Sequence, residues 1–499
     1  MTDNEERILR KDVDEVNQNV EALQEMKIYN AMRKGISEGK KRQKRRIYNT
    51  GIGVVAAASI ALFMYSSIGL PETGVAEHSV QSASTKNTDN FEAYRTSSRL
   101  EPALSSALEQ NLVMSVGQRA ENNGYQVDVT GAVSDGRKVY VLYSVQNNTD
   151  KEVIHANFEL QFEGIEESSL HKGSSLSMLA SDNRIGPGQS KDFIYSNYLA
   201  PSVEYPKEAN FNIILTETSE KALASSSNKY RTSLDVAFNL YHDWFKEKIR
   251  TFDTNGTLTV DGQKIKVTQV QYTPLSTYVD LEYDPNNDKQ IFQLINPVLI
   301  NKKGGTTTEK LYYPTIITSD NSEIYSDNSK FTLVFKNSKD SMNNLDSLPD
   351  SLSLKVFGIS AVEKDQMKIV VDLNKQEILE APGNGLEWVK PTSGKSTNPE
   401  SILFRHKITN SLFVGYTTRL SETFTDAKGE VHTRSYNTVS ADNVSSLSSG
   451  GGEFVNEFRY NFGEKANNYP QPLTITVEKY MNPIMVTEEL ILLEKVEFK

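Results

Sequence analysis

The sequence has 499 residues, enough for about three domains of roughly 150 residues each. It contains no cysteine, which excludes disulfides, zinc–cysteine sites, iron–sulfur clusters and thiol nucleophiles. The formal net charge is −11; residues 1–46 are net basic, whereas the chain after residue 70 is strongly acidic. An acidic surface is repelled by nucleic acid and by anionic lipid, so we expect no nucleic-acid partner.

Residues 1–46 are expected to form a cytoplasmic helical segment. Apolar residues recur in it at alternating spacings of four and three, the period of one helix face. This stripe consists of Leu9, Val13, Val16, Val20 and Leu23. Short helices have no core of their own, so an exposed stripe must be buried against something to be stable. Two interpretations remain open: the stripe binds a cytoplasmic partner, or the helix is marginal and merely precedes the membrane, with its basic end at anionic headgroups.

Residues 47–70 are predicted to form one transmembrane helix. They carry no charge and can cross about 30 Å of hydrocarbon at about 1.5 Å per residue. A basic run ends directly before them and contains Lys40, Lys41, Arg42, Lys44, Arg45 and Arg46. The positive-inside rule therefore places the N-terminus in the cytosol and residues 71–499 outside the cell membrane. A cleaved signal peptide fits less well, because 46 residues precede the apolar run and no clean A-x-A site follows.

Residues 70–74 spell LPETG, which resembles the sortase recognition sequence of wall-anchored Gram-positive proteins. In that family the pentapeptide lies near the C-terminus, ahead of an apolar segment and a basic tail. Here it follows the apolar segment, so cleavage would leave the part outside the membrane unattached. We therefore do not expect a sortase site.

The rest of the chain carries one order of features three times. A flexible stalk is expected over 71–95 and a short helix near 100–112, after which alternation with period two continues to the C-terminus. Each copy has an aromatic strand, then a strand that follows a Tyr-Pro or Leu-Pro pair, then a closing strand. The aromatic strands lie at 191–195, 330–335 and 453–460, the strands after proline at 211–215, 352–356 and 473–477, and the closing strands near 233–240, 367–373 and 489–493.

The copies lie roughly 120–140 residues apart, which is the size of one β-sandwich domain. Strands with period two bury one face only, so two sheets must stack to exclude water from that face. We therefore predict a mainly β fold with tandem Ig-like β-sandwich ectodomains. The expected modules are 96–241, 242–375 and 376–499. In the first, Ser134-Asp135-Gly136-Arg137 is predicted to form a hairpin turn between strands 125–129 and 139–145.

No catalytic, cofactor-binding or metal-binding residue is expected. The six histidines are dispersed, and neither HExxH, a GxSxG elbow nor a phosphate loop occurs. Asp-Asn pairs at 182–183, 320–321 and 442–443 lack the further carboxylates of a calcium loop and are interpreted as turn residues. The chain is not expected to be an enzyme, although a glycosidase-like pair among its many carboxylates stays open.

Three segments resemble a family of single-pass envelope proteins of Bacillus-type bacteria that carry domains of unknown function. They are the basic run 40–46 with its small-residue membrane helix, the hairpin SDGRKVY at 134–140, and LTVDGQKI at 258–265. The likeness covers most of residues 27–375. Family members resemble anti-sigma factors, in which a short cytoplasmic segment holds an extracytoplasmic-function sigma factor until an envelope signal arrives. The zinc-binding His/Cys signature of another anti-sigma class is missing here, so the resemblance implies binding through the helical stripe.

Two functions follow as hypotheses. In the first, the chain is a transmembrane regulator whose stripe packs on a sigma factor and whose modules sense or bind something at the cell surface. In the second, the modules bind wall polymer or a surface protein, and the membrane helix is a plain tether. A third, an ectoenzyme acting on the wall, lacks a recognisable site.

Overall fold

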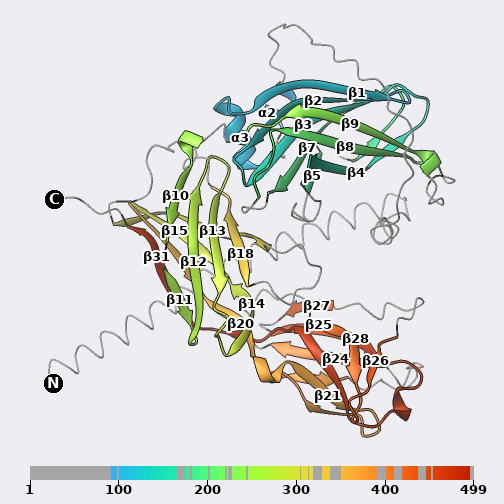
Figure 1. Ribbon diagram of the computed structural model, residues 1–499, viewed down its shortest axis with the longest axis vertical. Coiled ribbons are helices and arrows are strands. Elements are labelled where there is room, and N and C mark those ends of the chain that lie inside the picture. The colour runs from blue at the N-terminus through green and yellow to red at the C-terminus, as the bar shows by residue number, and fades with distance from the viewer. Residues whose placement is uncertain are drawn as a thin grey trace. The chain divides into compact units, whose positions relative to one another are not determined.

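The structure is a computed structural model (Figure 1), and it describes residues 91–494 except 98–99, 166–174, 179–181, 200–202, 220–221, 223–227, 243–245, 255, 304, 313, 319–328, 338–349, 390–400, 409–417, 436–445 and 451–452. This part is mainly β, and its strands pair in antiparallel sheets with few helices, as expected. None of the helices within it is long and apolar enough to cross a membrane. The expected cytoplasmic segment 1–46 and membrane helix 47–70 lie outside these residues.

Two short helices, α2 (Glu92–Arg95) and α3 (Pro102–Glu109), precede the first strand. Proline begins α3, where its missing N–H breaks no helical hydrogen bond. Tyr94 of α2 is buried and packs with Leu104 and Leu108 of α3. The stalk expected over 71–95 is therefore wrong in its last residues, because burial of Tyr94 holds them in a helix against the first module; residues 71–90 lie outside the described part.

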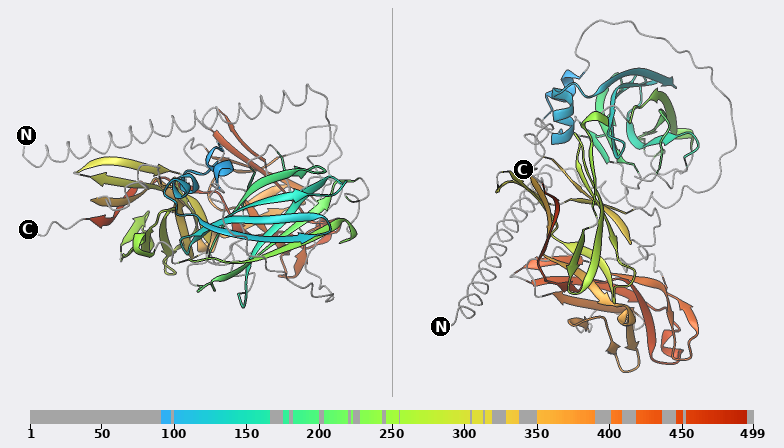
Figure 2. Two further views of the ribbon diagram at one scale, coloured as in Figure 1. Left: turned by 90° about the horizontal axis from the view of Figure 1, so that it is seen from above. Right: turned by 60° about the vertical axis from the view of Figure 1, so that its left-hand side comes forward.

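Two sheets form the first module and share one apolar core. Its strands are β1 (Met114–Asn122), β2 (Tyr125–Ser134), β3 (Lys138–Asn147), β4 (Val153–Phe162), β5 (Ser175–Met178), β6 (Arg184–Ile185), β7 (Ser190–Tyr198), β8 (Glu208–Glu217) and β9 (Arg231–Asn239). The sheet orders are β1-β2-β3-β7-β5 and β6-β4-β8-β9. Seen end-on in the right-hand view of Figure 2, these strands close around the core. The predicted hairpin is present, with Ser134 opposite Val139.

The second module also stacks sheets on one core. Its strands are β10 (Arg250–Asp253), β11 (Thr257–Val260), β12 (Gln263–Tyr272), β13 (Thr277–Tyr283), β14 (Lys289–Ile295), β15 (Val298–Lys303), β16 (Thr306–Tyr312), β17 (Thr315–Thr318), β18 (Lys330–Phe335), β19 (Ser351–Val356), β20 (Gly358–Glu363), β30 (Pro483–Ile484) and β31 (Glu488–Glu494). One layer has the order β10-β12-β13-β18-β17, with β11 on β12. The facing sheets are β14-β20-β30 and β16-β15-β19-β31.

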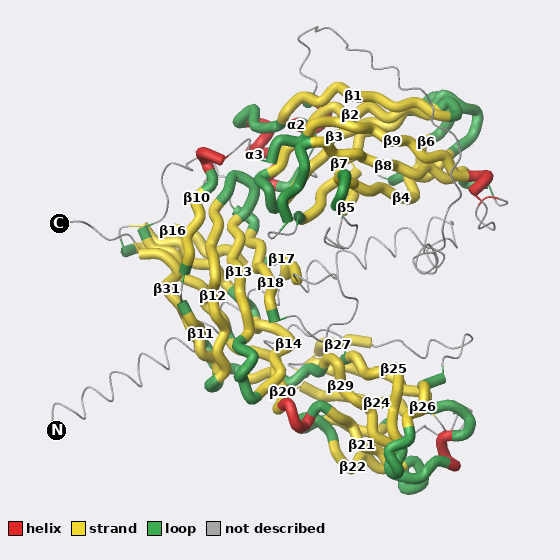
Figure 3. Tube along the Cα trace, in the orientation of Figure 1, coloured by secondary structure: helices red, strands yellow, loops and turns green. Residues whose placement is uncertain are grey.

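The third module also consists of sheets that stack on one apolar core (Figure 3). Its strands are β21 (Lys368–Asp372), β22 (Glu377–Glu380), β23 (Leu386–Trp388), β24 (Ser401–Ile408), β25 (Arg419–Thr425), β26 (Val431–Thr433), β27 (Ser446–Gly450), β28 (Glu453–Asn461) and β29 (Leu473–Lys479). They form the sheets β22-β21-β29-β25-β26 and β23-β24-β28-β27. The connections contain short 3-10 helices at Asn228–Tyr230, Lys246–Lys248, Lys364–Gln366 and Ala466–Asn468.

The same kinds of strand pair with one another in all three modules. The aromatic strands β7, β18 and β28 pair with β3, β13 and β24. The strands after proline, β8, β19 and β29, each pair with a closing strand.

The closing strands of the second and third modules are exchanged relative to expectation. The segment near 367–373 was expected to close the second module, yet β21 pairs with β29 of the third, with Ile369 opposite Ile475. The segment near 489–493 was expected to close the third module, yet β31 pairs with β19 of the second, with Leu354 opposite Leu490. Figure 1 shows β31, in red, among the green and yellow strands of the second module.

The third module is thus inserted into the second, between β20 and β30. The boundary expected at 375 falls inside the third module's sheets, because Ile369 and Val371 bury their side chains in that module's core. Where the chain returns, Gly358 lies directly against the carbonyl oxygen of Ile484, and a side chain there would collide with the backbone. Two chain connections therefore join these modules.

Removing β31 tests this exchange. Ending the chain after residue 487 should unfold the second module, because β19 loses its ladder partner and the core loses Leu490, Leu492 and Leu493. Hydrogen exchange should show lost amide protection in β12, β13 and β19, with protection retained in β24 and β28. A chain ending after residue 494 is the control. Loss of protection in the third module instead would contradict the pairing.

A buried histidine makes the first module sensitive to acid. His155 on β4 lies among aromatic rings, with Nε2 2.8 Å from Tyr143 Oη. Burial lowers the pKa of His155 from about 6.5 to about 4. As the pH falls, His155 therefore takes up a proton in the unfolded chain before it does so in the folded module. The free energy of unfolding is at its full value above about pH 6.5 and falls by about 3 kcal/mol towards pH 4.

The variant His155→Gln should show a weaker loss of stability between pH 6.5 and pH 4, because its amide cannot titrate. Hydrogen exchange of β4 and β8 amides as a function of pH measures the slope. His406→Gln, which removes a buried histidine of the third module, is the matched control and should leave that slope unchanged. Equal slopes in the wild type and His155→Gln would show that His155 does not carry the effect.

Candidate functional site

The residues expected to bind a partner, Leu9 to Leu23, and to orient the membrane helix, Lys40 to Arg46, all lie outside the described part of the chain. Their roles therefore stay predictions. Elsewhere, two clusters of polar side chains stand out. One lies where the hairpin turn 134–138 meets the second module, and the other at the turn between β25 and β26.

The first cluster centres on Asp135, whose side chain is buried in the turn between β2 and β3. Its Oδ1 accepts the backbone N–H groups of Arg137 at 2.9 Å and Lys138 at 2.7 Å, as aspartate does in tight turns. Its Oδ2 accepts hydrogen bonds from the hydroxyls of Thr273 at 2.6 Å and Tyr278 at 2.9 Å. One carboxylate thus shapes the turn and fastens it to the second module.

Arg137 extends this connection. Its Nη2 lies 2.8 Å from Asp280 Oδ1 and its Nη1 3.1 Å from Oδ2, a bidentate ion pair between the modules. Nη2 also donates to Thr332 Oγ1 at 3.1 Å, and this hydroxyl donates to Asp280 Oδ1 at 2.6 Å. The guanidinium carbon lies 4.7 Å from the ring centroid of Tyr278. Only 6% of Arg137 is exposed, so water screens the pair little.

Lys138 ties α3 to the same turn. Its buried Nζ lies 2.9 Å from Oε2 of Glu101, the residue before α3, and Tyr140 Oη donates to that oxygen at 2.7 Å. Burial raises the pKa of Glu101, but the Lys138 charge and the two hydrogen bonds outweigh it and lower the pKa to about 2. Burial and the adjacent Glu101 carboxylate raise the pKa of Tyr140. Lys336, just after β18, lies 3.7 Å from Glu101 Oε1.

These contacts define a closed electrostatic joint between the first two modules. A buried charge is tolerated only when it is paired and its polar atoms are hydrogen-bonded. Asp135 and Arg137 meet this condition only when the turn contacts the second module, and Lys138 meets it only when the turn contacts Glu101 before α3. The arrangement therefore favours one relative placement of these elements.

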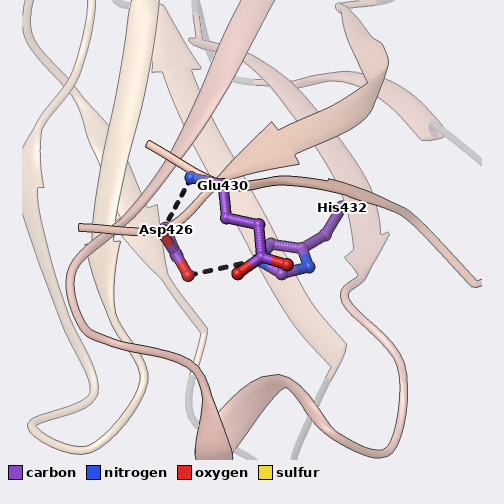
Figure 4. A group of neighbouring side chains, drawn as sticks. All are labelled: Asp426, Glu430 and His432. Carbon is purple, nitrogen blue, oxygen red and sulfur yellow. Dashed lines mark hydrogen bonds and ion pairs between the residues drawn. The ribbon is translucent and has the colours of Figure 1, made fainter. Parts of the chain in front are cut away.

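The second cluster lies in the third module, at the turn that joins β25 to β26 (Figure 4). The side chain of Asp426 is 1% exposed, and its Oδ1 accepts the N–H groups of Lys428 at 2.9 Å and Glu430 at 3.0 Å. Its Oδ2 lies 3.3 Å from His432 Nε2. The Glu430 carboxylate lies near this contact between Asp426 and His432. One ligand atom from each of the three side chains lies within 4.8 Å of the others.

Aromatic packing fixes the histidine of this cluster. The His432 ring stacks on Tyr469, with centroids 3.8 Å apart and planes 15° from parallel, and Phe424 lies 5.3 Å away. Burial raises the pKa of Asp426, but the Glu430 amide, His432 and the Lys428 amide outweigh it and lower the pKa. Asp426 is therefore an anion at neutral pH. Within the described ranges, these three residues form the group that could hold a metal ion.

Sequence reasoning missed this cluster, since no metal-binding residue was expected. The spacing Asp-x3-Glu-x-His places Glu430 and His432 two residues apart, as on one face of a strand, while Asp426 ends the partner strand. A turn predicted at Lys428-Gly429 would have placed the three side chains close together, but the hairpin at 425–431 was not identified from the sequence. In the joint, the Asp135 turn was foreseen, whereas its partners at 273–280 are visible only in the fold.

Comparisons with known proteins give little. No protein-family model matches the chain, and no curated protein sequence does. A conserved domain protein from Bacillus anthracis is similar over 54% of this chain and 84% of its own, at 10% identity and a TM-score of 0.33. The YadV chaperone matches 49% of this chain at 10% identity, and the CupB2 chaperone of Pseudomonas aeruginosa 45% at 13%, covering 90% of each, with TM-scores of 0.13. Similarities this weak assign neither fold nor function.

Removing the arginine of the joint should be costly. Arg137→Met leaves Asp280 without its partner, so we expect the free energy of unfolding to fall by about 3–5 kcal/mol. Arg119→Met, which breaks an exposed pair with Asp128, is the matched control and should cost at most about 1 kcal/mol. Urea titrations followed by tyrosine and tryptophan fluorescence measure both. Equal losses in the two variants would contradict the role given to the joint.

Proposed function

We propose that the chain is a single-pass membrane regulator similar to an anti-sigma factor. Residues 1–46 hold a cytoplasmic sigma factor, residues 47–70 cross the membrane, and residues 71–499 form an extracellular sensing or binding part with Ig-like sandwiches. One observation carries this proposal: an uncharged run of 24 residues directly follows a basic run and separates an amphipathic segment from a large β-rich part.

The joint between the first two modules supports signalling over simple tethering. α2 begins at Glu92, so only 21 residues separate it from the end of the proposed membrane helix at Leu70. α3 is bound through Glu101 to Lys138, and the turn that carries Lys138 is bound to the second module. Under this proposal, a change imposed on the second module would be passed through these contacts to the elements nearest the membrane in sequence, a route that a plain tether does not need.

A charge in the cytoplasmic stripe tests this function. Val16→Asp should abolish co-purification of a sigma factor with the full-length protein from detergent-solubilised membranes, because an aspartate cannot be buried unpaired in an apolar interface. Asn17→Asp adds the same charge one residue away, outside the stripe, and should retain the partner. Quantitative mass spectrometry of the purified complexes measures the ratio.

The alternative is a membrane-tethered surface protein that binds wall polymer or another protein and has no cytoplasmic signalling role. It predicts that no sigma factor co-purifies with the wild type and that deletion of residues 1–39 leaves sigma-dependent transcription unchanged. Either result would overturn the regulator proposal and favour the tether.

A further inference from the structure

We propose that Asp426, Glu430 and His432 bind one zinc-like divalent cation through Asp426 Oδ2, a Glu430 carboxylate oxygen and His432 Nε2 (Figure 4). The site belongs to the third module and does not depend on the regulatory function proposed above. It contains two carboxylates and one imidazole on a single hairpin.

The spacing of Asp426 Oδ2 and His432 Nε2 suits a tetrahedral ion, and the Glu430 ligand atom lies within 4.8 Å of both. Asp426 Oδ2 and His432 Nε2 lie 3.3 Å apart, which is long for a charge-assisted hydrogen bond of about 2.7–2.9 Å. Bonds of about 2.0–2.1 Å to a tetrahedral zinc ion place two ligand atoms about 3.3 Å apart. The observed separation therefore needs little adjustment to receive a cation, whereas a tight ion pair would draw the two atoms closer.

Two of the ligands are already held in place. Asp426 Oδ1 is engaged by two backbone amides, which leaves Oδ2 for the cation. The His432 ring is held by stacking on Tyr469. Binding therefore orders only the exposed Glu430 side chain, so little conformational entropy is lost.

The ligand set selects the kind of ion. Calcium and magnesium require about six or more oxygen ligands, and an imidazole does not suit them. Zinc accepts mixed nitrogen and oxygen ligands with four-fold coordination. Three side chains leave a fourth position, which water can fill because Glu430 and the edge strand β26 face solvent; Val431 beside them is 65% exposed.

Zinc titration of the untagged full-length protein in detergent, after treatment with a chelator, tests the site. Isothermal titration calorimetry should show one Zn²⁺ bound per chain, and Co²⁺ should give the visible absorption of a tetrahedral complex. Glu430→Gln and His432→Gln should each weaken binding at least tenfold, or about 1.4 kcal/mol. Glu377→Gln changes an exposed glutamate on β22, at the other edge of the same sheet, and should bind as the wild type does.

Glu430→Gln is the decisive variant, because its exposed side chain packs in no core, whereas His432→Gln also removes the stack on Tyr469. Circular dichroism verifies that both variants are folded. If the folded wild type takes up no Zn²⁺, or if Glu430→Gln binds it as tightly as the wild type, the cluster only closes the turn and the proposal is wrong.

Discussion

The bidentate ion pair between Arg137 and Asp280 is the constraint on which the arrangement of the first two modules depends. Neither charge has an equivalent partner elsewhere within hydrogen-bonding reach in the described structure, and Arg137 is nearly excluded from water. The pair is stable because Asp135, Thr332 and Tyr278 complete the surrounding polar contacts. A joint of this kind gains more in specificity of placement than in net stability, since desolvation offsets much of the Coulomb attraction.

The two polar clusters differ in how completely they are satisfied. In the joint, each charged side chain is matched by partners of the chain itself at ordinary hydrogen-bond distances, so no ligand capacity is left over. In the turn of the third module, two carboxylates face one imidazole, one contact is long and one carboxylate is exposed. The first cluster is therefore interpreted as a structural contact, and the second as a group that can bind a cation.

The alternation of apolar and polar residues identified strands from the sequence, but it did not predict which strands pair with one another. Alternation at 191–195, 330–335 and 453–460 identified the aromatic strands, and the turn at 134–137 was predicted from its Asp-Gly pair between two alternating strands. Alternation says which face of a strand is buried but not which partner it joins, so β21 and β31 were assigned to the wrong modules. Asp280 and Tyr278 looked like ordinary strand residues, because their partners lie about 140 positions away.

Because β31 is the last strand to be synthesised, the second module cannot be completed until the third module has been made. Between the end of β20 and the start of β31 the ribosome must synthesise residues 364–487, which include the whole third module. During that interval β19 presents an unpaired edge, the kind of surface on which strands from other chains can add. The inserted module, by contrast, has all its strands as soon as it emerges. We therefore expect the inserted third module to fold first. The second module, begun more than a hundred residues earlier in the chain, is completed last, when β31 pairs with β19.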